Sequence, residues 1–268
     1  HNSALTLFKN SKRNNDKCKN KTSHESYIEK YSEKHKALSA QLLIAEMIKN
    51  GITTFCDDDI FPNYMIDEIT KAKIRCCIGL KICKKKTEWA NNEDESLNKA
   101  LRIFDDNKNN PDIKFFFNPV SVNDVSEGMF QKISKIANEL DIPIRMSINT
   151  SKKEINECIK HNKCRPLDYI EKFDILNNKF TALNTLILNL DDIKLLEKYR
   201  SNLVINKTTQ LLSAEIIINR LLKRKINVIL STGVMGNYSD SNILDEMTIL
   251  SLLSNIKKTE LNTNTILK

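Results

Sequence analysis

The sequence has little glycine and proline and few histidines, and these scarcities narrow the classes of site that it can hold. Its 268 residues include five glycines, five prolines, four histidines and one tryptophan. No glycine-rich turn follows an apolar run, so we expect neither a dinucleotide-binding turn nor a phosphate-binding loop. No stretch of about 18 apolar residues occurs, so we expect no membrane partner.

Charge and cysteine content argue against two further classes. The formal net charge is +8, but the lysines are scattered and 6% of the residues are aromatic, so we expect no nucleic-acid partner. Seven cysteines include the adjacent Cys76 and Cys77 but no CxxC spacing, which argues against a zinc knuckle or a disulfide framework. Residues 1–4 do not have the basic character of a signal peptide. We therefore expect a cytoplasmic protein with reduced thiols.

Strand-like runs alternate with amphipathic runs, the order that is typical of a parallel sheet covered by helices. The apolar pattern predicts strands over residues 52–56, 74–80, 115–117, 142–148, 182–190, 202–205 and 226–231. It predicts helices over residues 37–50, 64–72, 129–140, 155–160, 191–199, 213–224 and 244–253. About seven strand–helix units favour a (β/α)8 barrel, with an open doubly wound sheet as the alternative. We expect one domain over residues 1–268, with residues 84–110 as a helix-containing insertion.

Several motifs resemble those of one family and occur in its order. Residues 43–57, LIAEMIKNGITTFCD, resemble the signature AEMIKSGTTTFxD of the amidohydrolases, and of their methylthioadenosine/S-adenosylhomocysteine deaminase and chlorohydrolase branch in particular. Further matches are SALTLFKN at 3–10, TSKKEINEC at 150–158, RPLDYI at 165–170, NVILSTG at 227–233 and DEM at 245–247. The resemblance implies an α/β fold of the TIM type, a (β/α)8 barrel that is complete or incomplete. We expect this chain to lack the β-sandwich that the family also has.

The family's chemistry uses a divalent metal such as zinc at the mouth of the barrel, where the metal activates a water. Carried over through the matching motifs, the metal ligands fall at Asn2, Ser147, Leu186 and Gly233. The proton-shuttling glutamate falls at Thr150 and a substrate-contacting histidine at Ile205, while Asn206 is retained. A further family histidine falls near Val120. Since such side chains do not bind zinc tightly, we expect no metal cofactor and only vestigial site positions.

The other polar residues offer few substitutes. We expect surface or helix-capping roles for the four histidines: His1, His24, His35 and His161. Residues 57–59 are three consecutive aspartates after a predicted strand, and their oxygens are a weak candidate for a cation site. Arg145 lies on a predicted strand. If buried, it needs a carboxylate partner, and the alternative is an anion bound at the mouth.

Three functions stay open. The leading hypothesis is a catalytically inactive amidohydrolase-like protein with a binding or scaffolding role. The second is a divergent metal-dependent hydrolase that acts on C–N bonds of a purine-derived substrate, through His1 and an aspartate such as Asp57 or Asp240. The third is a non-catalytic subunit of an active paralogue, or a homo-oligomer, formed through the flank that a missing β-sandwich would expose.

Overall fold

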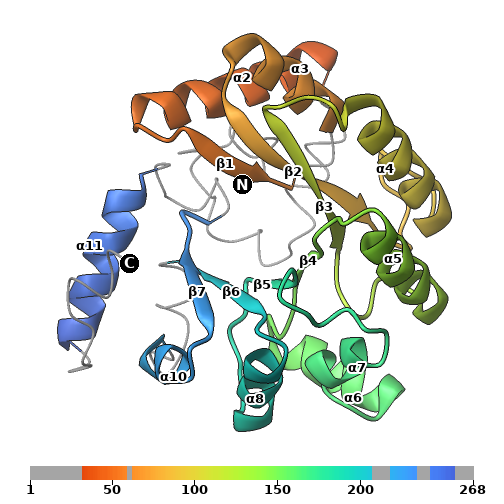
Figure 1. Cartoon of the computed structure of the whole chain (residues 1–268), viewed down its shortest axis with the longest axis vertical. Helices are drawn as coiled ribbons and strands as arrows, with labels where there is room; N and C mark the ends of the chain where they lie inside the picture. The colour runs from red at the N-terminus through yellow and green to blue at the C-terminus, as the bar shows by residue number, and fades with distance from the viewer. Residues whose placement is uncertain (1–31, 59–61, 207–217, 234–241, 257–268) are drawn as a thin grey trace, which may run out of the picture.

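The computed structural model describes residues 32–58, 62–206, 218–233 and 242–256, which form an α/β fold with parallel strands (Figure 1). The strands are β1 (Thr54–Asp57), β2 (Arg75–Ile82), β3 (Ile113–Pro119), β4 (Arg145–Ser147), β5 (Thr181–Leu183), β6 (Asn202–Ile205) and β7 (Asn227–Leu230). The helices are α2 (Glu33–Lys49), α3 (Pro62–Ala72), α4 (Glu93–Asn107), α5 (Glu127–Glu139), α6 (Lys152–Asn162), α7 (Pro166–Glu171), α8 (Leu190–Lys198), α10 (Ile218–Lys223) and α11 (Ile243–Ile256). Among the described residues, no helix has the length and apolar character needed to cross a membrane.

The strands pair in parallel and follow the order of the sequence. β1, β2 and β3 form one sheet, and β4, β5, β6 and β7 form a second. A parallel bridge between Phe117 and Ile144 connects the two sheets. Figure 1 shows the strands around a common centre with the helices outside them, as in a barrel. Within the described ranges β7 does not pair with β1, so the α/β fold is confirmed while the closure of a (β/α)8 barrel stays a prediction.

The main core lies between the strands and the helices. Successive residues of a strand point to opposite faces, and the side chains that face the helices are buried, including Ile78, Met146 and Leu203. Burial of each such side chain contributes about 2 kcal/mol to the free energy of unfolding. Their neighbours face the inside of the ring and are half-buried, among them Cys77 and Val204. The fold therefore depends mainly on its outer layer.

A glycine makes room for an aromatic ring inside the ring of strands. Gly79 on β2 is the register partner of Phe116 on β3. A Cβ atom at Gly79 would lie 2.7 Å from Phe116 Cζ and 3.1 Å from the Cα of Asp58. The Phe116 ring therefore occupies the space that a side chain on residue 79 would need.

Two predicted segments differ from the structure. Residues 84–110 are not an insertion, because they contain α4, the helix that connects β2 to β3 as a normal crossover. The strand predicted over residues 182–190 covers only β5, and the chain then turns at Asn184, whose φ is 50°. The N–H groups of Leu186 and Ile187 donate to the Asn149 carbonyl instead of to a strand. An apolar run alone does not distinguish a strand from such a packed loop.

A buried ion pair joins α7 to α8. The Arg165 guanidinium donates to both carboxylate oxygens of Asp192, from Nε over 3.2 and 3.1 Å and from Nη2 over 2.5 Å. The Asp192 side chain is 1% exposed, and the N–H of Asn189 also donates to it over 2.9 Å. The neighbouring Asp191 pairs with Lys194 over 2.8 Å, but its side chain is 72% exposed. Asp191 and Asp192 thus carry the same charge but differ in burial, so Asp191 is a matched control for Asp192.

We predict that Asp192→Asn lowers the free energy of unfolding by up to about 3 kcal/mol, because it leaves the Arg165 charge without its buried partner. Asp191→Asn removes the same charge from an exposed ion pair, so its urea midpoint should stay near that of the wild type. Urea denaturation of the three proteins checks this. Equal midpoints for the two variants would show that the buried pair does not stabilise the packing of α7 on α8.

Candidate functional site

The mapped site positions lie together at one edge of the ring. Ser147 and Ile205 are the last residues of β4 and β6, and Thr150, Leu186 and Gly233 each lie three residues after the end of a strand. The carboxyl ends of parallel strands meet at one edge, where barrel enzymes hold their active sites. Asn2 lies outside the described residues.

Two of these positions have local hydrogen-bond partners. The Ser147 hydroxyl accepts a hydrogen bond from the Asn184 side-chain amide over 2.9 Å. Thr150 donates to one carboxylate oxygen of Glu154, from its N–H over 2.7 Å and from its hydroxyl over 2.6 Å. Glu154 is buried in the first turn of α6. The carboxylate nearest in sequence to Thr150 is therefore bound back onto the helix start, a role that the sequence did not predict.

The other positions carry no donor for a metal. Leu186 is half-buried, and Ile205 is buried in the hydrophobic core. Val204, the residue before Ile205, lines the interior cavity. Because adjacent strand residues point to opposite faces, the Ile205 side chain points away from this cavity. Gly233 has a φ of 74°, and a Cβ atom built on it would lie 3.0 Å from Nδ2 of the buried Asn206.

A tightly bound zinc needs about three or four nitrogen, sulfur or carboxylate ligands. Across the described residues no group of three His, Cys, Asp or Glu side chains is placed to hold a metal ion. His35 is exposed beside the N-cap Ser32 of α2, as expected for a capping residue, and His161 is exposed in the last turn of α6. His1 and His24 lie outside the described residues. The described side chains at this edge do not fit the family's metal.

The inside of the ring contains a cavity of about 440 Å³. Its apolar wall includes Phe116, Leu183, Val204, Ile229 and Leu230. Its polar wall includes Thr54, Cys56, Asp58, Arg145, Thr181, Ser231 and Thr232. A largely apolar cavity of this size with a few polar groups is typical of a site for a small molecule.

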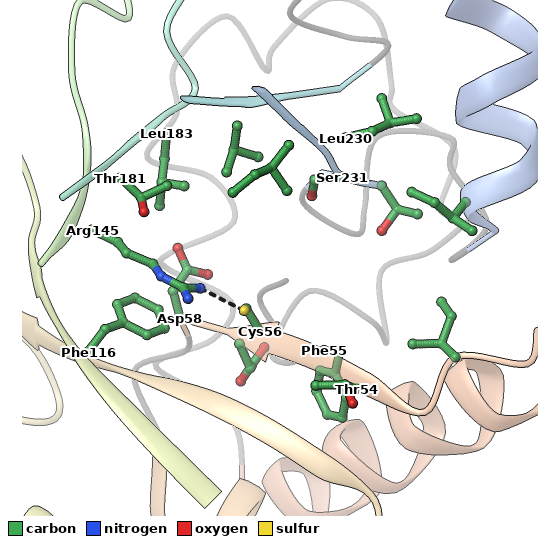
Figure 2. Close-up of a pocket in the computed structure, with 16 residues that line it drawn as sticks. Thr54, Phe55, Cys56, Asp58, Phe116, Arg145, Thr181, Leu183, Leu230 and Ser231 are labelled. Carbon is green, nitrogen blue, oxygen red and sulfur yellow. Dashed lines mark hydrogen bonds between the residues drawn. The ribbon is translucent and has the colours of Figure 1, made fainter. Parts of the chain in front are cut away.

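Arg145 is the cation of this cavity. Figure 2 shows its side chain reaching from β4 towards Cys56 on β1, with Phe116 beside it. Arg145 Nη1 donates to Cys56 Sγ over 2.7 Å, and the guanidinium carbon lies 4.6 Å from the centroid of the Phe116 ring. Within the part of the chain that the structure describes, Arg145 thus contacts a thiol and an aromatic face where a carboxylate partner was expected. Asp57 is buried and Asp58 is half-buried, and both line the cavity, while Asp59 lies outside the described residues. Among the described side chains, these aspartates belong to no group of three that could hold a cation.

The environment of Cys56 favours its ionised form. A hydrogen bond from the Cys77 thiol and the charge of Arg145 outweigh burial and lower the pKa of Cys56 to about 5. The pKa of Cys77 is raised by this same hydrogen bond and by burial. This pair was not predicted from the sequence, although both residues have the strand phase that faces the inside of the ring.

Comparisons with known proteins agree with the motifs. The sequence model of the amidohydrolase family matches residues 13–267. The 5-methylthioadenosine/S-adenosylhomocysteine deaminase of Saccharophagus degradans is 26% identical over 215 residues, 80% of this chain and 48% of that protein. The 5'-deoxyadenosine deaminase of Methanococcus vannielii is 25% identical over 212 residues, 78% of this chain and 50% of that protein. The chain thus spans about half the length of the curated relatives it matches, and the predicted resemblance is confirmed.

Solved structures show the same fold. A guanine deaminase from C. acetobutylicum with bound guanine superposes with a TM-score of 0.84 at 18% identity, over 99% of this chain and 68% of that chain. An adenosine deaminase from Xanthomonas campestris with bound zinc gives a TM-score of 0.80 at 21% identity, over 88% and 55%. At these identities the likeness is one of fold.

We predict that Gly233→Ala lowers stability more than Gly51→Ala, a control at nearly the same φ of 73°. The control should cost about 1 kcal/mol, the strain of a side chain at positive φ. A Cβ at Gly51 would contact nothing within 4 Å, whereas one at Gly233 would lie 3.0 Å from Asn206 Nδ2. Urea midpoints of both variants check this. Equal midpoints would mean that the loop after β7 has room for a side chain such as the family's aspartate.

Proposed function

Because the chain belongs to the amidohydrolase family, we propose that it is a member without metal-dependent deaminase activity. The chemistry at the carboxyl edge of the strands carries this proposal. Ser147, Leu186 and Gly233 occupy mapped ligand positions, and a serine hydroxyl, an alkyl group and a hydrogen atom do not replace imidazole or carboxylate ligands of zinc.

The proton-transfer group supports the same proposal. The family motifs map the shuttling glutamate onto Thr150, and a threonine hydroxyl has no pKa near neutral pH with which to move protons. Glu154, four residues later, is buried and accepts two hydrogen bonds from Thr150. Its carboxylate therefore serves the start of α6 and is not presented to a substrate.

We propose a binding role for the cavity that remains. Its volume of about 440 Å³ suits a molecule of nucleoside size. Its apolar wall can pack against a flat ring, and its hydroxyl groups and Arg145 provide polar contacts. The proposed function is binding of a purine-derived molecule without turnover.

A second candidate is a non-catalytic subunit that docks on an active paralogue or on a second copy of itself. The observation in its favour is α11, whose Leu244, Leu252 and Ile256 are 64%, 55% and 75% exposed. A helix that is apolar around most of its circumference usually packs against protein on more than one side. Size-exclusion chromatography of the chain alone and with the paralogue tests this candidate. Elution as a monomer, both alone and in the presence of the paralogue, would contradict this candidate.

We predict that the protein, assayed in the presence of excess zinc, releases no ammonia from methylthioadenosine, S-adenosylhomocysteine or 5'-deoxyadenosine above the rate in buffer. Isothermal titration with the same nucleosides should still detect binding, and Val204→Trp, which fills the cavity wall, should weaken it at least about tenfold. The deaminase of Saccharophagus degradans serves as the positive control for the ammonia assay. Zinc-dependent ammonia release by this chain would instead support the divergent hydrolase, with displaced ligands.

A further inference from the structure

Two cysteines lie side by side on the inside of the ring. Cys56 on β1 and Cys77 on β2 are register partners in parallel strands, so their side chains point to the same face. Both are half-buried, and the Cys77 thiol donates a hydrogen bond to the Cys56 sulfur. Cys76, one residue earlier, is buried on the opposite face. The pair therefore faces the cavity, and its neighbour does not.

Arg145 gives this pair an electrostatic asymmetry. Its Nη1 lies 2.7 Å from Cys56 Sγ, and among the described residues it forms no ion pair with a carboxylate. A partly buried cation without a carboxylate partner favours an anion at its nearest acceptor. That acceptor is Cys56, so one thiol of the pair is held as thiolate and the other keeps its proton.

We propose that Cys56 is a thiolate that reacts with hydroperoxides and that Cys77 converts its oxidised form to a disulfide. Two geometric facts support the pair. Cys56 lines the cavity, which gives a small peroxide space beside the sulfur. Neighbouring strands lie about 4.8 Å apart, within the range of about 4.4–6.8 Å between Cα atoms that a disulfide spans. The proposal does not depend on the proposed function.

The chemistry is balanced with a hydroperoxide as the sole co-reactant. The Cys56 thiolate attacks one peroxide oxygen, the O–O bond breaks, and the other oxygen leaves and takes a proton to become water or an alcohol. Cys56 is then a sulfenic acid. The sulfur of Cys77 attacks it, the S–S bond forms, the S–O bond breaks, and the proton of Cys77 leaves with the hydroxide as water. The two thiols supply the two electrons that reduce the peroxide.

The first test follows the alkylation of each cysteine by iodoacetamide against pH in the reduced wild-type chain, read by peptide mass spectrometry. The rate at Cys56 should rise through about pH 5 and level off above it, in line with its lowered pKa. Cys164 is the internal control, since it is also half-buried and its thiol donates to the Asn162 carbonyl. At pH 5.5 Cys56 should react about tenfold faster than Cys164, after allowance for the lower nucleophilicity of a low-pKa thiolate.

The second test adds hydrogen peroxide in stoichiometric amount. The wild type should form a peptide cross-linked between Cys56 and Cys77. Cys77→Ser should instead accumulate a sulfenic acid on Cys56 that dimedone traps, and Cys56→Ser should leave Cys77 reduced. Arg145→Met should move the midpoint of the pH profile of Cys56 upward by more than one pH unit, while that of Cys164 stays in place.

Two results would overturn the proposal. One is a wild-type experiment in which the alkylation rates of Cys56 and Cys164 depend on pH in the same way. This result does not depend on whether any variant folds. The other is oxidation that leaves Cys56 reduced, or that links it to a cysteine other than Cys77. Circular dichroism of each variant confirms that its reactivity is measured on the folded chain.

Discussion

The fold rests on one constraint: each parallel strand must bury its outer face beneath a helix. Ile78, Met146 and Leu203 satisfy this constraint from three different strands. The residues at the carboxyl ends of the strands, such as Ser147 and Gly233, lie outside this layer of packing. Substitutions at these ends therefore need not disturb the outer layer, which is consistent with our proposal that this member of the amidohydrolase family keeps its fold without its metal chemistry.

The inner face of the strands differs from the outer face, because its side chains are only half-buried and include a cation. Arg145 rests on the Phe116 ring and donates to Cys56, and Gly79 leaves the space that the ring occupies. Strands β1, β2, β3 and β4 thus each contribute to one electrostatic arrangement. A cation that has no carboxylate partner among the described residues is satisfied by a thiolate, and the neighbouring Cys77 thiol stabilises that thiolate further.

The sequence predicted the outer layer well, because apolar periodicity reports which residues face the helices. The strand over residues 202–205 has the predicted bounds, and the helix over residues 129–140 is α5 within a few residues. The residues to which the family motifs map the metal ligands lie at or shortly after strand ends within the described residues, and their vestigial character stays a prediction. The inner face was less predictable, since Cys56 and Arg145 are 89 positions apart and meet only through the order of the strands. The predicted strand also failed after Leu183, because the apolar residues there form a loop whose N–H groups donate to the Asn149 carbonyl.

The most direct test of the central claim is the metal content of the chain. Protein purified without an affinity tag would be incubated with excess zinc, desalted, and analysed for zinc, iron, manganese and nickel. We predict far less than one metal ion per chain, because the side chains at the mapped positions do not fit a metal. One full equivalent that survives desalting would contradict it and would mean that other residues of the chain complete a metal site.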